Sequence, residues 1–113
     1  MTFATVVLAS VLAPMNLTAS VYGSEFHGRT QANGKPYNHK GISFASRDHG
    51  LGTRIRVKYR NRSVEGIVTD RINARFKGKR IDLSGGAWAH LTGGAKPGLR
   101  KVVVEVVQST GRP

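Results

Sequence analysis

Cysteine is absent from this chain of 113 residues. Its absence excludes disulfide bonds, thiolate zinc sites, covalent haem attachment, a cysteine nucleophile and any lipid anchor that requires an N-terminal cysteine. The four histidines lack the spacing of metal ligands, so we expect no metal and no cofactor. The length suits one compact domain, which we expect to be a monomer held together by its own hydrophobic core.

Acidic residues are scarce as well. Six Asp and Glu stand against eighteen Lys and Arg, which gives a formal net charge of +12 and a pI of about 11.2. Such a charge favours an anionic partner, which can be nucleic acid, an anionic membrane face or an acidic cell-wall polymer. The basic residues are spread along the chain, which argues against a disordered basic tail.

Long hydrophobic runs are missing except near the N-terminus. Residues 2–13 are almost wholly apolar but too short to cross a bilayer as a helix, which needs about 20 residues. Their length suits the core of a signal peptide, although no Lys or Arg precedes Arg29. We therefore expect residues 1–17 to be a leader and the protein to be exported, to the periplasm or outside the cell. A buried N-terminal strand or helix is the alternative.

Aromatic residues are few and glycines number fourteen, a balance typical of a turn-rich β-domain. Short runs with strand character, separated by turn residues, occupy residues 18–22, 42–45, 54–60, 63–69, 80–83 and 101–107. The valine-rich run at 101–107 is apolar on both faces at most positions, so we expect it to be central. The number of short strands predicts a mainly β fold, a small closed barrel with one or two short helical turns.

Two local patterns sharpen this prediction. The run 54–60 alternates strictly, so one face should be buried while the other carries four cations, and a turn should join it to 63–69 as a hairpin. Ser84 is placed to cap a short helix that runs through Leu91, with Trp88 in the core.

Two of the six acidic residues follow or belong to predicted strands. Asp70 ends the run 63–69, where it could cap a turn, pair with Arg71 or act in a site. Asp82 lies just before the predicted helix, and we interpret it mainly as part of the scaffold, accepting backbone or arginine hydrogen bonds near that terminus.

Several short motifs occur in order along the chain. They read ASVYG at 19–23, FHGR at 26–29, ANG at 32–34, GTRIRV at 52–57, TDR at 69–71 and RIDLS at 80–84. Together they resemble the rare-lipoprotein-A (RlpA-like) family, over nearly all of residues 18–108 and leaving 109–113 as a tail. The resemblance implies a six-stranded double-psi β-barrel. It also implies an exported bacterial protein that cuts peptidoglycan glycan strands as a lytic transglycosylase, a carbon–oxygen lyase.

The chain departs from the family pattern at positions that matter for chemistry. Lys35 stands where the family has a glutamate, Asn38 where it often has an aspartate, and Ser46 where it has a histidine. Asp70 remains from the family's expected catalytic set. One carboxyl group can serve a lytic transglycosylase, first as acid and then as base, because the muramic acid C6 hydroxyl is an internal nucleophile. We expect Lys35 to lie near Asp70, which would favour its ionised form and weaken it as an acid.

The resemblance also implies residues that contact the substrate. Tyr22 and Tyr37 are candidate sugar platforms, although packing in the core or at the rim would suit them equally. In the family that the chain resembles, the sugar chain lies across an open groove on the barrel. Glu25 is an extra carboxylate that could act in the site if its loop folds over that groove, and a solvated loop charge is the alternative. We predict Asp70 as the catalytic residue and the following as substrate-binding: Tyr22, His27, Arg29, Lys35, Tyr37, Asn38, Ser46 and Arg71.

Three functions are compatible with these observations. The first is a secreted peptidoglycan lytic transglycosylase. The second is a non-lytic barrel of the expansin type that binds or loosens peptidoglycan, with other anionic wall polymers as further ligands. The third is a nucleic-acid-binding barrel that uses the cations at 54–60 and 75–80, which the leader and the family motifs oppose.

Overall fold

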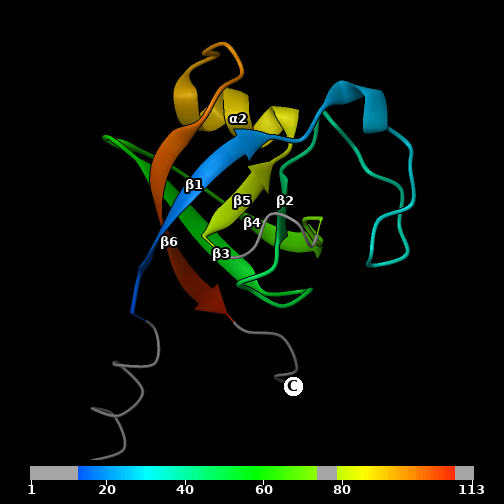
Figure 1. Cartoon of the computed structure of the whole chain (residues 1–113), viewed down its shortest axis with the longest axis horizontal. Helices are drawn as coiled ribbons and strands as arrows, with labels where there is room; N and C mark the ends of the chain where they lie inside the picture. The colour runs from blue at the N-terminus through cyan, green and yellow to red at the C-terminus, as the bar shows by residue number, and fades with distance from the viewer. Residues whose placement is uncertain (1–12, 74–78, 109–113) are drawn as a thin grey trace, which may run out of the picture.

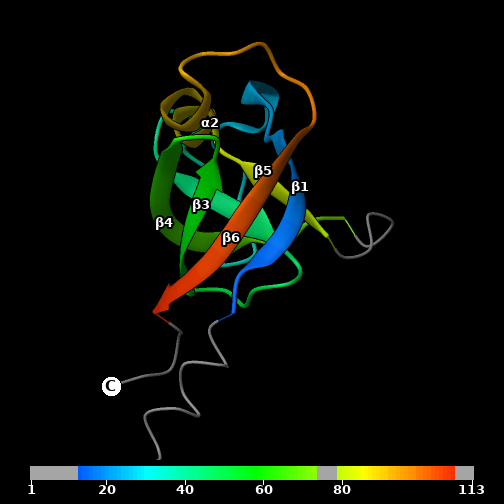
Figure 2. The same cartoon turned by 90° about the vertical axis from the view of Figure 1, so that its left-hand side faces the viewer.

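Six strands close into a barrel in the order β1-β5-β2-β4-β3-β6 (Figures 1 and 2). The structure, a computed structural model, describes residues 13–73 and 79–108. Its elements are β1 (Met15–Val21), the 3-10 helix η1 (Ser24–Phe26), β2 (Ser43–Ser46), β3 (Arg54–Tyr59), β4 (Arg62–Asp70), β5 (Arg80–Leu83), α2 (Gly85–Thr92) and β6 (Arg100–Gln108). The predicted six-stranded barrel is confirmed.

The barrel mixes parallel and antiparallel pairing. β1 runs parallel to β5 and β2 runs parallel to β4, whereas the other neighbouring strands are antiparallel. The predicted hairpin is present: β3 and β4 pair from Arg54 opposite Ile67 to Tyr59 opposite Arg62. β6 lies between β1 and β3. Every strand of a closed barrel has two neighbours, so this position does not test the expectation that the valine-rich strand is central.

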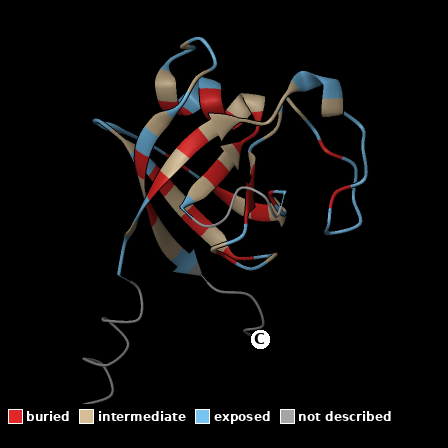
Figure 3. Ribbon diagram, in the orientation of Figure 1, coloured by how far each residue is buried: buried red, intermediate tan, exposed pale blue. Residues whose placement is uncertain are grey.

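Alternation along the strands builds the core. On β3 the side chains of Ile55 and Val57 are buried, and on β6 those of Val102 and Val104 are buried (Figure 3). Inward-facing residues from all six strands join residues of α2 in one hydrophobic cluster that includes Trp88. Burial of this apolar surface is the main force that closes the barrel.

The N-terminal strand begins earlier than the sequence suggested. Met15 pairs with Val104 of β6, and Leu17 is buried in the core. Residues 15–17, which we assigned to the leader, therefore belong to β1. Residues 1–12 and 109–113, the rest of the expected leader and the expected tail, lie outside the described residues. Among the residues that are described, no helix has the length and hydrophobicity needed to span a membrane.

The short helix α2 begins where Ser84 predicts. The Ser84 hydroxyl accepts a hydrogen bond from the backbone N–H of Ala87, which satisfies one of the unpaired donors of the first turn. The helix ends at Gly93, which adopts the left-handed conformation with φ of 74°. The helix packs against β4 and β5, and Arg62 at the start of β4 donates from Nε to the backbone carbonyl of His90, at 3.3 Å.

Candidate functional site

Two aspartates from different strands line one hollow of the barrel. The hollow has a volume of about 490 Å³ and is lined by residues from β1, the loop that holds η1, and strands β2, β4 and β5. Asp70 of β4 and Asp82 of β5 both line it, together with Ala45 of β2 between them. We call this hollow the groove.

A register shift turns Asp70 toward the groove. Phe44 of β2 pairs with Val68 of β4, but the next residue, Ala45, pairs with Asp70, so Thr69 is left without a partner on β2. Because side chains alternate along a strand, skipping one residue changes which side chain faces a given side. Thr69 instead donates from its hydroxyl to the side-chain oxygen of Gln31, at 2.7 Å.

The Asp70 carboxylate is held by three donors. Its Oδ1 accepts hydrogen bonds from the backbone N–H groups of Ala32 (2.9 Å) and Arg71 (2.8 Å). Its Oδ2 accepts one from the hydroxyl of Tyr22, at 2.8 Å. These three hydrogen bonds fix the orientation of the Asp70 carboxylate in the groove.

Tyr22 is itself held by aromatic packing. Its ring stacks on that of Tyr37, with the ring centres 4.3 Å apart, and it also contacts Phe26. Burial, the hydrogen bond to Asp70 and the Asp70 charge raise the pKa of Tyr22 to about 12. The Tyr22 hydroxyl therefore keeps its proton near neutral pH and remains a donor to Asp70.

Tyr37 has a supporting role. Its hydroxyl donates to the backbone carbonyl of Tyr22 (2.9 Å) and lies 2.9 Å from Nδ1 of His39. Since the single hydroxyl proton is used toward Tyr22, Nδ1 of His39 must carry the hydrogen of that second bond. Burial is the main cause that raises the pKa of Tyr37, so it too stays neutral.

Asp82 differs from Asp70 in its surroundings. Its Oδ1 accepts a short hydrogen bond from the hydroxyl of Ser20, which also accepts a bond from Arg80 at 3.2 Å. Burial raises the pKa of Asp82, and the Ser20 hydrogen bond and the Arg80 charge offset that effect only in part. We interpreted Asp82 mainly as scaffold, but it also lines the groove, and burial holds its pKa above that of an ordinary aspartate.

Basic residues line the other sides of the groove. Arg29 and Arg71 both contribute to its wall, and the Arg29 guanidinium lies 5.4 Å from the centre of the Phe26 ring. Glu25 is exposed on η1, and its carboxyl group folds back against Gly23, another residue of the groove wall. Glu25 was expected to act in the site only if its loop folds over the groove, and Glu25 itself is not among the residues that line the groove.

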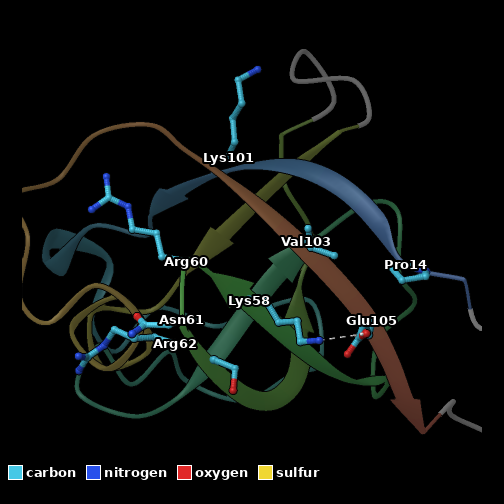
Figure 4. A pocket seen from close by; sticks show the side chains of 9 residues that line it. Pro14, Lys58, Arg60, Asn61, Arg62, Lys101, Val103 and Glu105 are labelled. Carbon is cyan, nitrogen blue, oxygen red and sulfur yellow. Dashed lines mark hydrogen bonds and ion pairs between the residues drawn. The ribbon is translucent and has the colours of Figure 1, made fainter.

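A broader basic hollow lies on the opposite side of the barrel, because β6 is the strand diametrically opposite β2. Lys58 pairs with Glu105 at 3.4 Å, and Arg60, Arg62 and Lys101 line the same hollow with their side chains directed away from this pair (Figure 4). On β3, Arg56 also pairs with Glu65 (2.6 Å) and Glu105 (3.3 Å). The predicted face of four cations is thus partly neutralised by two acidic residues on neighbouring strands.

Comparison with known proteins decides the family. The model of a double-psi β-barrel family described as "Lytic transglycolase" matches residues 15–106. The chain belongs to this family. It is 42% identical over 93 residues to the probable endolytic peptidoglycan transglycosylase RlpA of Synechocystis sp., covering 80% of this chain and 28% of that protein. It is 37% identical over 91 residues to the endolytic peptidoglycan transglycosylase RlpA of Pseudomonas aeruginosa, covering 78% of this chain and 26% of that protein.

Other matches are closer in length. The uncharacterized protein ssl3177 of Synechocystis sp. is 38% identical over 96 residues, with 83% of this chain and 98% of that protein covered. The solved structure of Streptomyces papain inhibitor aligns with a TM-score of 0.68 and 19% identity, covering 85% of this chain and 96% of that chain. The latter likeness shows a shared fold. The RlpA-like resemblance and the double-psi β-barrel expected from the motifs are confirmed, while the chain spans little more than a quarter of the two RlpA proteins.

Two residues that the family pattern suggested for substrate contact are buried instead. Tyr37 is 1% exposed beneath Tyr22, so its ring has no free face for a sugar. Ser46 is also 1% exposed, and its hydroxyl accepts hydrogen bonds from the backbone N–H groups of Asp48 and His49. Both predictions are corrected: these side chains support the structure around the groove and do not line it.

Three other predicted contact residues are exposed but stand apart from the groove wall. His27 is exposed, and its Nδ1 accepts a hydrogen bond from the backbone N–H of His39, at 3.1 Å. Lys35 and Asn38 line a separate hollow on the far side of the turn at residues 31–35. Lys35 was expected beside Asp70, but the two residues line different hollows. In the described part of the chain, no group of three His, Asp or Glu side chains could hold a metal ion.

Proposed function

We propose that this barrel is an exported peptidoglycan lytic transglycosylase that cuts glycan strands and forms 1,6-anhydro products. The observation that carries the proposal is the pair Asp70 and Asp82 in one groove, with opposite surroundings. Membership of a family described as lytic transglycolase supports the reaction class. A location in the periplasm or outside the cell belongs to the same proposal, because the substrate lies there.

The two carboxyl groups divide the proton transfers. Asp82, which burial holds toward its protonated form, gives its proton to the glycosidic oxygen as the bond between that oxygen and C1 breaks. Asp70, held as an acceptor, takes the proton of the muramic acid C6 hydroxyl as O6 bonds to C1. One proton is given and one is received, and no water enters the product. This assignment replaces the single carboxylate that we expected to act first as acid and then as base.

Other residues of the groove position the sugar. Tyr22 orients Asp70 and leaves its ring at the groove wall, where an aromatic face suits a sugar. Arg29 and Arg71 line the same wall and supply donors for hydroxyl and carbonyl groups of the glycan. With these contacts a glycan strand lies in the groove, beside Ala45, Asp70 and Asp82.

A second candidate is a non-lytic barrel that binds or loosens peptidoglycan. The observation that favours it is the identity of Lys35 and Ser46, which stand at the family's glutamate and histidine positions. Ser46 is buried and Lys35 lies outside the groove, so neither residue replaces the missing groups. In this case the groove binds glycan and the two aspartates serve as hydrogen-bond acceptors.

The decisive experiment is digestion of purified sacculi, followed by mass spectrometry for 1,6-anhydro-muropeptides. The wild type is compared with Asp70→Asn and Asp82→Asn, and with Glu65→Gln as a matched carboxylate-to-amide control at a residue of β4 that pairs with Arg56 and does not line the groove. We expect products from the wild type and the control, and a loss of at least about 100-fold in both groove variants. Binding to sacculi without products from any of the four proteins would favour the non-lytic barrel.

A further inference from the structure

A second hollow adjoins the groove on the other side of the turn at residues 31–35. It has a volume of about 350 Å³ and is lined by nine described residues, none of which is acidic. The backbone N–H of Asn33 donates to the carbonyl of Thr69 at 3.2 Å, and Thr69 directly precedes Asp70. The hollow therefore begins one residue along β4 from the Asp70 carboxylate.

Hydrogen-bond donors dominate this hollow. The side-chain oxygen of Asn33 accepts from the backbone N–H of Lys35 (3.0 Å), and that of Asn38 accepts from the backbone N–H of Lys40 (3.1 Å). Each amide also carries an NH2 group, which only donates. Lys35 adds an ammonium group, which also only donates. Such a set favours a negatively charged acceptor.

An apolar side chain completes the wall. Ile42 lines the same hollow and is 45% exposed, which is high for a large aliphatic residue. A ligand that combines a charged acceptor with a short aliphatic group would use both parts of this surface. A carboxylate on a small carbon skeleton has this chemistry.

The neighbouring groove has the opposite electrostatic character where Asp70 and Asp82 line it. A carboxylate placed beside Asp70, the proposed proton acceptor, would be repelled by that residue, whereas the same group beside Lys35 would be attracted. The contrast between the two hollows therefore favours binding of the glycan strand with its carboxylate beside Lys35, rather than in the reverse direction with its carboxylate beside Asp70.

We propose that the hollow lined by Asn33, Lys35 and Asn38 is a subsite for a carboxylate carried by the glycan strand. The inference rests on the peptidoglycan substrate proposed above. Two parts of that polymer carry such a group: the lactyl ether of muramic acid from which the peptide has been removed, and the amino acids of the stem peptides. The subsite thus sets how the strand is placed relative to Asp70.

The test measures binding of the full chain to four insoluble substrates. These are peptide-free glycan strands and intact peptide-bearing sacculi, each before and after amidation of its carboxyl groups. Wild type is compared with Lys35→Gln, and Lys96→Gln serves as the control, since it removes the same charge from the exposed loop between α2 and β6. Circular dichroism checks that all three proteins are folded.

We expect the wild type and Lys96→Gln to bind at least one unmodified substrate about fivefold more tightly than its amidated form. Lys35→Gln should bind both forms equally. The substrate on which the preference appears, peptide-free or peptide-bearing, identifies the source of the carboxylate.

Two results separate failure of this inference from failure of the proposed function. Equal binding of unmodified and amidated substrates by the wild type, or a preference that persists in Lys35→Gln, overturns the subsite and leaves the peptidoglycan proposal standing. Absence of binding to all four substrates overturns both.

Discussion

Asp70 and Asp82 lie level with the same residue, Ala45 of β2, one on each neighbouring strand. They are twelve positions apart in the chain, and β2, which precedes both, is inserted between their strands. The register shift beside Thr69 brings Asp70 rather than Thr69 to this level. The pairing of strands, and not the sequence spacing, therefore brings the two carboxyl groups into one groove.

Removal of the Tyr22 hydroxyl should show how much the orientation of Asp70 contributes to activity, separately from the packing of the Tyr22 ring. Tyr22→Phe loses the 2.8 Å bond to Asp70 but keeps the ring that stacks on Tyr37. We expect about a tenfold loss in the release of anhydro-muropeptides, with thermal stability nearly unchanged. Tyr59→Phe, which removes a hydroxyl from β3, is the matched control. A spectrophotometric titration should also lose a tyrosine that titrates near pH 12 in the wild type.

The raised pKa of Asp82 should appear in the pH dependence of stability. A carboxyl group whose pKa is higher in the folded than in the unfolded chain binds more protons when folded. Its contribution to stability is therefore complete below its ordinary pKa of 3.8 and is lost as the pH rises through the folded-state value.

Urea unfolding of the wild type and Asp82→Asn between pH 3 and pH 7 measures this effect. The difference in unfolding free energy, wild type minus variant, should fall as the pH increases, because the other titrating groups are common to both proteins. A difference that rises with pH would show that the Ser20 hydrogen bond and the Arg80 charge outweigh burial.

Ser84 joins α2 to the segment before β2. Its buried hydroxyl accepts hydrogen bonds from the backbone N–H groups of Ser43 (3.0 Å) and Ala87 (3.2 Å) and donates to the carbonyl of Gly41 (2.6 Å). Ser84→Ala should lower the free energy of unfolding by about 2–3 kcal/mol, because it removes a helix cap and leaves buried groups unpaired. Ser63→Ala, at an exposed position of β4, should change it by less than about 0.5 kcal/mol, as measured by urea denaturation.

Gly86 allows α2 to approach the loop before β2. A Cβ atom at this position would lie 2.4 Å from the backbone oxygens of both Lys40 and Gly41, which cannot move without shifting the loop. Gly86→Ala should therefore cost about 2–3 kcal/mol of stability, despite the better helix propensity of alanine. At Gly50, by contrast, the nearest atom would be 3.9 Å away, so Gly50→Ala is the tolerated control in the same thermal melts. Equal melting temperatures for the two variants would contradict the close approach.

Much of the fold could be predicted because its signals are local. The alternation of residues 54–60 identified a strand with Ile55 and Val57 inside, and Ser84 identified the start of α2. The motif series identified the family and with it the barrel. The expected boundary between leader and barrel, at residue 18, was less accurate. Apolar residues such as Met15 and Leu17 suit both a leader and a buried strand, so the sequence does not distinguish the two.

The site was harder to predict than the fold. The sequence by itself determined which residue types are available: no thiol, few carboxylates, an excess of cations, and Asp70 at the end of a strand. Only the tertiary structure decided that Asp82 shares the groove, that Tyr37 and Ser46 are buried, and that Lys35 faces a different hollow from Asp70. The physical reason is that exposure and electrostatic environment depend on strands distant in sequence, whose order and register in the closed barrel are set by packing of the whole core.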